Sequence, residues 1–203
     1  MQSALALCGV LALSACGAKY AQVPPRLELA PYGRVAVVTF AADQQAQPGM
    51  DALTTQRFAE ALLASQTGVE LLELDRADSS VRNVPAFDAP ALAKALGRDK
   101  DVAAVFVGEL KVSGVKPRGN LSAAGVNMRA AVSAELTVRL LSTRTGGTVW
   151  RSSAAANGTV GRVALTRGLP KVAMRDQDEA YGEVVHELVT GVTRDLRPTW
   201  VKQ

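Results

Sequence analysis

The sequence predicts an α/β fold: a single three-layer-like domain with a mixed sheet of about five strands and helices packed on the sheet. Two observations support this fold class. Strand-like and helix-like segments alternate over residues 34–112, which is typical of a parallel sheet. Two long segments of alternating apolar and polar residues then follow, separated by Gly146-Gly147, a hairpin turn signal. The predicted order is strand, helix, strand, helix, strand, strand, strand, helix.

The first five elements follow from residue type and spacing. The opening strand, RVAVVTF, is apolar and β-branched, which indicates burial on both faces. Asp88 is a good N-cap for the second helix, and Pro90 falls in its first turn, where a missing N–H costs nothing. In chain order these elements are a strand over 34–40, a helix over 50–65, a strand over 69–74, a helix from Asp88 to Gly97 and a strand over 102–112.

The last three predicted elements are longer than the strands before them. Residues 128–140 alternate apolar and polar side chains, which predicts a long strand with one face in water. After the Gly146-Gly147 turn, residues 148–163 return as a second long strand. Segments 113–127 and 164–175 are expected to be loops. Acids from Asp176 onward open a final helix that extends to about Leu196, before Pro198.

The N-terminus carries an export signal. Residues 4–13 form an apolar run that is too short to span a bilayer and is typical of a signal peptide. The run ends in Leu13-Ser14-Ala15-Cys16-Gly17, which resembles the bacterial lipobox. Small residues there let a peptidase approach the backbone, and the cysteine sulfur carries the diacylglycerol. We therefore expect residues 1–15 to be a cleaved lipoprotein signal peptide and Cys16 to be lipidated.

The residue after the cysteine suggests where the protein goes. Enterobacterial lipoproteins kept in the inner membrane often have Asp at this position, whereas this chain has Gly17. The resemblance implies a lipid anchor in the outer membrane, on its periplasmic face. Residues 16–33, with Pro24, Pro25 and Pro31, are expected to be an extended tether, and residues 34–203 the folded domain.

Charge and cysteine content exclude several classes of function. The formal net charge of +4 is too small to indicate nucleic-acid binding. Both cysteines, Cys8 and Cys16, lie in or next to the leader, so the domain has no disulfide framework and no cysteine metal site. We expect no cofactor, no metal and no nucleic-acid partner.

Several short stretches resemble the curli-secretion lipoprotein (CsgG/HfaB) family and its relatives, the LpoB activator and the N-terminal domain of TolB. They are the opening strand Arg34-Val35-Ala36-Val37-Val38-Thr39-Phe40, the strand Val105-Phe106-Val107-Gly108-Glu109-Leu110 after Ala95-Leu96-Gly97, and the hairpin Thr145-Gly146-Gly147-Thr148-Val149-Trp150. The resemblance covers roughly residues 35–196. It implies an envelope lipoprotein that assists a larger assembly.

The sequence offers little for catalysis. His186 is the only histidine and falls within the final helix, where it is expected to be a surface or packed residue. Glu73 and Asp75 are one residue apart at a strand end and could act as an acid–base pair, or simply be solvated charges. We therefore expect a protein that is not an enzyme and keep a carboxylate-dependent envelope hydrolase as the less favoured alternative.

A basic cluster is the main candidate site. If the last three strands form a meander, the ends of segments 113–127 and 164–175 meet, and eight cations collect there. They are Lys111, Lys116, Arg118, Arg129, Arg162, Arg167, Lys171 and Arg175. We expect them to dock on an anionic surface, either lipid phosphate or a protein partner, or to be scattered solvated charges.

These observations favour a non-enzymatic outer-membrane lipoprotein that is an accessory or assembly component of a cell-envelope or secretion complex. Its expected contacts are the membrane, through the N-terminal lipid, and an envelope protein partner or further copies of itself. The alternative within this class is a monomeric activator of a peptidoglycan-synthesis enzyme.

Overall fold

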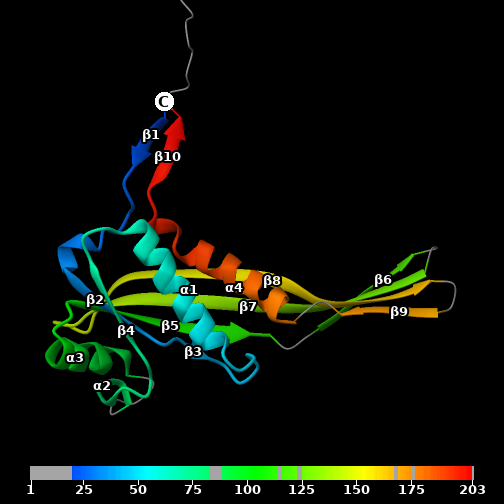
Figure 1. Cartoon of the computed structure of the whole chain (residues 1–203), viewed down its shortest axis with the longest axis horizontal. Helices are drawn as coiled ribbons and strands as arrows, with labels where there is room; N and C mark the ends of the chain where they lie inside the picture. Colours follow the sequence, from blue (N-terminus) through cyan, green and yellow to red (C-terminus); the bar gives the residue numbers. More distant parts are fainter. Residues whose placement is uncertain are drawn as a thin grey trace, which may run out of the picture.

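A mixed sheet with helices on both faces forms the body of the protein (Figure 1). The computed structural model describes residues 20–82, 88–113, 116–122, 125–166, 169–174 and 177–202. The strand order of the main sheet is β4-β2-β5-β7-β8-β9. In chain order, the helices and strands of the body and its extension are β2 (Arg34–Val38), β3 (Ala41–Ala42), α1 (Met50–Ser65), β4 (Glu70–Leu74), α2 (Ser79–Arg82), α3 (Ala89–Lys100), β5 (Ala104–Val112), β6 (Lys116–Ser122), β7 (Gly125–Ser142), β8 (Thr148–Thr166), β9 (Leu169–Met174) and α4 (Gln177–Val192).

The pairing confirms the predicted fold class. β2 pairs in parallel with β4 and β5, whereas β7 is antiparallel to both β5 and β8. The larger elements follow the predicted order of strand, helix, strand, helix, strand, strand, strand, helix. The parallel half thus comes from the alternating segments and the antiparallel half from the hairpin, as parallel strands need a long crossover and antiparallel strands a short turn.

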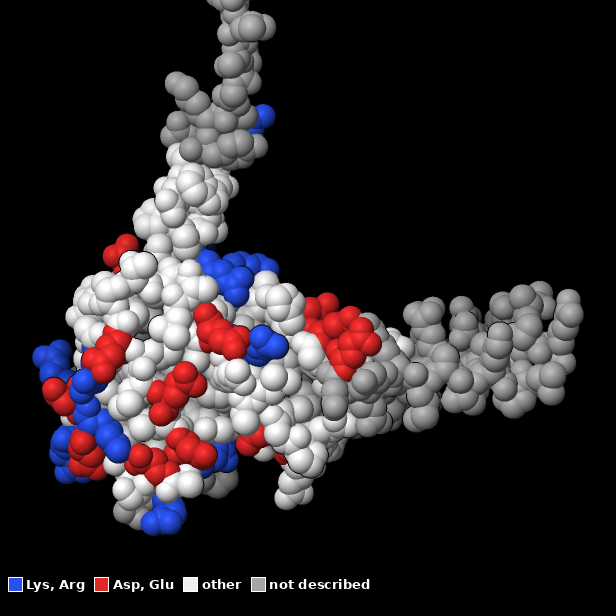
Figure 2. All heavy atoms as spheres, in the orientation of Figure 1, with Lys and Arg blue, Asp and Glu red and all other residues white. Residues whose placement is uncertain are grey.

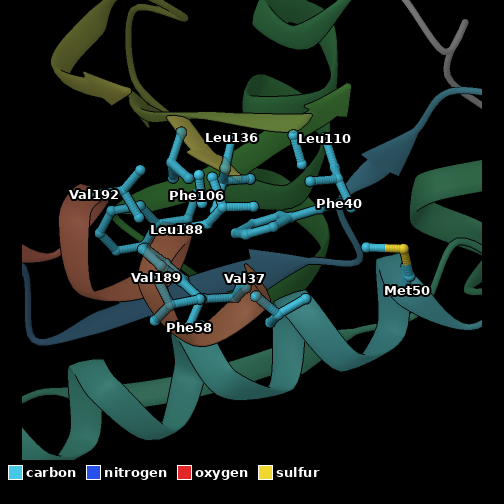
Figure 3. Packing of buried hydrophobic residues seen from close by; sticks show 14 of the residues in the cluster. Val37, Phe40, Met50, Phe58, Phe106, Leu110, Leu136, Leu188, Val189 and Val192 are labelled. Carbon is cyan, nitrogen blue, oxygen red and sulfur yellow. The ribbon is translucent and has the colours of Figure 1, made fainter. Parts of the chain in front are cut away.

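Two apolar clusters hold the layers together. Against the first face of the sheet, α1 and α4 bury Phe58 and Leu188 with Phe106 of β5. Against the other face, α3 buries Ala93 and Leu96. Figure 3 shows Phe40, Phe58 and Phe106 at the centre of the first cluster. Their ring centroids are 5.2 Å apart from Phe40 to Phe58 and 5.2 Å from Phe58 to Phe106, followed by 6.0 Å from Phe106 to Trp150.

The second helix begins as predicted and ends later. The Asp88 carboxylate accepts a hydrogen bond from the Ala91 amide at 2.9 Å, which confirms its role as the N-cap. The predicted end at Gly97 is wrong, because α3 continues to Lys100. A Cβ atom at Gly97 would lie 2.6 Å from the Cβ of Thr143. Gly97 is therefore required for close packing of helix on sheet, and Asp101, with φ of 53°, ends the helix.

The two segments that we expected to be loops contain strands. β6 lies within 113–127 and pairs with β7, and β9 lies within 164–175 and pairs with β8. The far ends of β7 and β8 extend with them beyond the last residue of β5. These four strands form a finger that projects from the end of the body (Figure 1). Here we define the finger as β6, β9 and residues 125–133 and 157–166.

The segment that we expected to be an extended tether is folded from Tyr20 onward. β1 (Tyr20–Val23) pairs antiparallel with β10 (Thr199–Lys202) in a two-stranded ribbon that projects from the body (Figure 1). Short 3-10 turns at Ala30–Tyr32 and Arg194–Leu196 join the ribbon to the domain. α4 ends at Val192, before this second turn, rather than at Leu196.

The base of the ribbon is held by one buried side chain. The Leu29 amide donates a hydrogen bond to Gln66 Oε1 at 2.8 Å. Gln66 Nε2 donates to the carbonyl oxygens of Leu27 at 3.1 Å and Leu196 at 2.6 Å. Gln66 follows α1 directly, so it ties the chain before β2 and the chain after α4 to the same point of the body.

Residues 1–19, which include the predicted signal peptide and Cys16, lie outside the described residues, so lipidation remains a prediction. Within the described part of the chain, no helix has both the length and the apolar character that a membrane crossing needs.

Candidate functional site

The two segments of sequence that include the finger are rich in basic residues. Residues 113–133 and 157–175 include Lys116, Arg118, Arg129, Arg162, Arg167, Lys171 and Arg175, and no Asp or Glu. With a net charge of +4 for the whole chain, the remaining residues carry a net charge of 4 − 7 = −3. On the face of the body that Figure 2 shows, acidic and basic side chains are instead interspersed.

The strand register aligns three of these arginines. Arg118 of β6 pairs with Arg129 of β7, and Arg129 pairs with Arg162 of β8. Directly paired residues of antiparallel strands lie on the same face, with their Cβ atoms about 4.5–5.5 Å apart. Like charges at such positions destabilise a sheet. The register thus brings three cationic residues to adjacent positions, and we call Arg118, Arg129 and Arg162 the arginine row.

The other predicted cations have different positions. Lys116 in β6 and Lys171 in β9 belong to the same finger, opposite Ala131 and Ala164 respectively. Lys111 lies on the body at the end of β5, where its ammonium group is 3.5 Å from the Glu109 carboxylate. Arg167 and Arg175 lie outside the described residues.

The register also separates the charged positions of the finger from uncharged ones. Gly119, Met128, Val163 and Val172 occupy one cross-strand row, and Pro117, Ala130, Gly161 and Met174 occupy another. These rows alternate along the strands with the arginine row. Sequence reasoning missed this arrangement because the short, Gly-containing runs were not recognised as strands.

A hydroxyl network joins the finger to the body. The Ser113 amide donates to the Ser133 carbonyl at 2.7 Å, and the Ser133 amide donates to Ser113 Oγ at 2.9 Å. Ser133 Oγ donates to Asn157 Oδ1 at 2.6 Å. These bonds keep β5, β7 and β8 aligned where β5 ends. Ser113 and Ser133, together with Lys111 and Glu135, also line an open groove of about 550 Å³.

Of the residues considered for catalysis, Glu73 and Asp75 lie at the end of β4, whereas His186 lies on α4. Glu73 is exposed in β4, and the Asp75 carboxylate accepts a hydrogen bond from the Ala77 amide at 3.2 Å, which makes it part of a turn. His186 is exposed on α4. Among the described residues, no three His, Cys, Asp or Glu side chains are placed to share a metal ion.

Asp78 makes folding stability depend on pH. Its carboxylate accepts hydrogen bonds from the Ser80 amide at 2.9 Å and from Lys100 Nζ at 3.0 Å, and these contacts lower the pKa of Asp78. A lowered folded-state pKa stabilises the protein above the unfolded value of about 3.9, and this contribution disappears as the pH falls through the folded pKa.

We therefore expect Asp78→Asn to lower the melting temperature at pH 7, and this deficit to shrink as the pH falls below about 4. Thermal unfolding across this pH range measures the effect. Glu73→Gln, a change at an exposed carboxylate, is the control and should not differ from the wild type. A deficit of constant size at all pH values would exclude the carboxylate as its source.

Comparison with known proteins shows a shared fold. No family model and no curated protein matches the sequence. A neuraminyllactose-binding hemagglutinin homolog from Helicobacter pylori matches with a TM-score of 0.52 and 8% identity, over 81% of this chain and 86% of that chain. The PelC dodecamer from Paraburkholderia phytofirmans matches with a TM-score of 0.47 and 15% identity, over 89% and 98%. The C-terminal domain of LpoB from Salmonella enterica matches with a TM-score of 0.40 and 13% identity, over 62% and 83%.

These observations define the protein as an α/β module whose fold also occurs in bacterial proteins of known structure. Structures described as lipoproteins are among those that resemble the chain. At these identities the likeness concerns the fold alone, so the function has to be argued from the molecule's own surface.

Proposed function

We propose that this protein is a non-enzymatic, lipid-anchored component of a cell-envelope assembly that binds an anionic partner protein through its finger. Cys16 carries the lipid and holds the protein on the periplasmic face of the outer membrane. The observation that carries the proposal is the arginine row, set in a finger segment whose sequence contains no acid. The sequence resemblance to the CsgG/HfaB family supports the same class of function.

The composition of the finger favours a protein over a lipid surface as the partner. Elements that lie on a membrane combine their cations with large apolar side chains that enter the lipid. The cross-strand rows next to the arginine row contain glycine, proline and alanine beside Met128, Val163, Val172 and Met174, and no aromatic residue. A partner protein with acidic groups can match the arginine row without such an apolar surface.

The short reach of the anchor favours a partner close to the membrane. Residues 17–19 alone separate Cys16 from β1, and three residues span at most about 10 Å. A protein tethered in this way meets proteins of its own membrane or further copies of itself more easily than a distant wall-synthesis enzyme. The monomeric activator is therefore the second choice. The mass of the acylated protein in mild detergent separates the two, since a ring-forming CsgG-like component gives a discrete large oligomer.

A matched pair of double variants tests the finger. Arg129 and Arg162 are paired on β7 and β8 within the finger, and Arg139 and Arg151 are paired on the same two strands within the body, where both are exposed. With proteins that begin at residue 17, and so lack both the leader and the lipid, we expect Arg129→Gln with Arg162→Gln to weaken binding to isolated envelope membranes by about tenfold. Arg139→Gln with Arg151→Gln should change it less than twofold.

Sedimentation of the protein with envelope membranes measures this binding. Prior digestion of the membranes with protease should abolish the interaction if the partner is a protein. Binding that survives digestion would show that lipid phosphate is the anionic surface. Equal weakening by both double variants would show that general positive charge, and not the arginine row, is responsible.

A further inference from the structure

The β1–β10 ribbon exposes an unusual amount of apolar surface. Trp200 is 64% exposed, Val201 49% and Val23 41%, and Trp200 has the largest exposed fraction among the exposed large hydrophobic residues of the described chain. The ribbon projects from the body (Figure 1), and among the described residues its two strands pair only with each other. An isolated two-stranded ribbon is at best marginally stable in water. Its exposed apolar residues therefore suggest that another surface covers it.

The position of the ribbon indicates which surface that is. Tyr20, at the outer end of β1, pairs with Lys202 of β10, and Cys16 precedes Tyr20 by four residues. Four residues span at most about 14 Å. A lipid on Cys16 would therefore keep the outer end of the ribbon within the headgroup layer of the membrane that holds it.

The side chains of the ribbon suit this layer. Tryptophan is enriched at membrane–water interfaces, where its ring contacts the acyl boundary and its N–H contacts headgroups. Lys202 is exposed beside it, and Arg26 at the base has an 84% exposed side chain, although its guanidinium lies 3.6 Å from the Asp195 carboxylate. Cations in these positions are attracted to anionic phospholipids.

The register indicates how the ribbon would enter. Trp200 is opposite Gln22, whereas Val201 is opposite Ala21 and Thr199 is opposite Val23. Trp200 therefore lies on one face of the ribbon, and Val201 and Val23 lie on the other. A flat protein surface could cover only one of these faces. A fluid lipid layer can surround both when the ribbon enters it end-on.

We propose that the β1–β10 ribbon is a second membrane anchor, which inserts Trp200 and Val201 into the interface of the phospholipid leaflet that holds the Cys16 lipid. The proposal rests on the lipid anchoring of the proposed function. Because Gln66 fixes the base of the ribbon to the body, a ribbon seated in the membrane also sets the orientation of the body. The finger would then be presented in one defined direction, and not at random around a flexible tether.

Tryptophan fluorescence tests this directly. The chain has two tryptophans, Trp200 in the ribbon and Trp150, which contacts Phe106 in the body. With protein that begins at residue 17, and so lacks both the leader and the lipid, vesicles of phosphatidylethanolamine and phosphatidylglycerol should shift the emission to shorter wavelength, and brominated acyl chains should quench it. Trp200→Ser should abolish both signals and weaken vesicle binding by about tenfold. Leu63→Ser, at a 54% exposed residue of α1, should leave both unchanged.

Several outcomes would overturn the proposal. One is unshifted emission with vesicles, and another is equal vesicle binding by wild type and Trp200→Ser. A blue shift that appears without vesicles as the protein concentration rises would show instead that ribbons cover one another. Loss of the signal in the Arg129→Gln, Arg162→Gln variant would assign membrane contact to the finger.

The vesicle assay tests the ribbon separately from lipidation, because it uses protein without a lipid. Mass spectrometry of the wild type tests lipidation. The absence of an acyl group on Cys16 would overturn lipid anchoring and leave the result of the vesicle assay unchanged.

Discussion

Replacing Phe106 with alanine is expected to lower the free energy of unfolding by about 3–5 kcal/mol. The Phe106 side chain is fully buried on β5, between the rings of Phe58 and Trp150. Its strand also joins the parallel half of the sheet to the antiparallel half. Removing the ring leaves a cavity at this junction and breaks two aromatic contacts, each worth about 0.5–1.5 kcal/mol beyond burial. Urea unfolding followed by circular dichroism measures the loss.

Two further variants show whether position or apolar character sets this cost. Phe106→Leu keeps part of the volume and should fall between wild type and alanine. Leu63→Ala removes an apolar side chain that is 54% exposed on α1 and should cost about 0.5 kcal/mol or less. A loss below about 1 kcal/mol for Phe106→Ala would contradict the central position of this ring.

Replacing Gln66 with leucine is expected to cost about 2–4 kcal/mol and to loosen the ribbon from the body. The Gln66 side chain satisfies the Leu29 amide and the carbonyl oxygens of Leu27 and Leu196. Leucine fills a similar volume but leaves these three backbone groups without a partner, and each buried, unpaired group costs about 1–3 kcal/mol. The measurements are urea unfolding and the rate of proteolysis after Arg26, which should rise more than the global loss of stability explains.

Gln66→Glu separates hydrogen bonding from shape. A carboxylate at this place still accepts from the Leu29 amide, but it faces the two carbonyl oxygens without a proton to donate. Repulsion and burial favour the neutral form, so the carboxyl pKa in the folded variant should be raised. The variant should then be most stable at low pH and lose stability as the pH rises through that pKa. A variant with the pH profile of the wild type would show that the carboxylate turns out to solvent.

Elements with a strong local signal were predicted well. The helix over residues 50–65 has the predicted bounds, because its apolar residues repeat at helical spacing between clear breaks. Asp88 caps the next helix as predicted, since capping depends on neighbouring residues alone. The alternation over residues 128–140 likewise identified the strand with one wet face, where Glu135 and Arg139 are exposed and Leu136 and Val138 are buried.

Elements that depend on distant partners were missed. β6 has the sequence KPRGNLS, with proline, glycine and no β-branched residue, so nothing local favours a strand. It is paired with β7 along its whole length, and this pairing builds the element. β1 depends in the same way on β10 at the other end of the described chain. Gly97 was interpreted as a helix end because glycine commonly follows helices. Its contact with Thr143, a residue far along the chain, could not be predicted from neighbouring residues.

The sequence predicted which basic residues belong to the candidate site, but not how the strands arrange them. Counting cations near the strand ends identified Arg118, Arg129 and Arg162, but their alignment on three adjacent strands depends on a register that no local pattern reveals. Lys111 was included because it ends β5, yet it is beside Glu109 on the body. The part played by Arg167, Arg175 and Cys16 stays a prediction.

Pairing between the two extremes of the described chain also bears on the order of folding. Synthesis from the N-terminus makes β1 early and β10 late. Closing so long a loop has an entropic cost, so it follows the local hairpins and helices. Closure of the ribbon is therefore expected to be a late step of folding, and β1 lacks its strand partner until the body has formed.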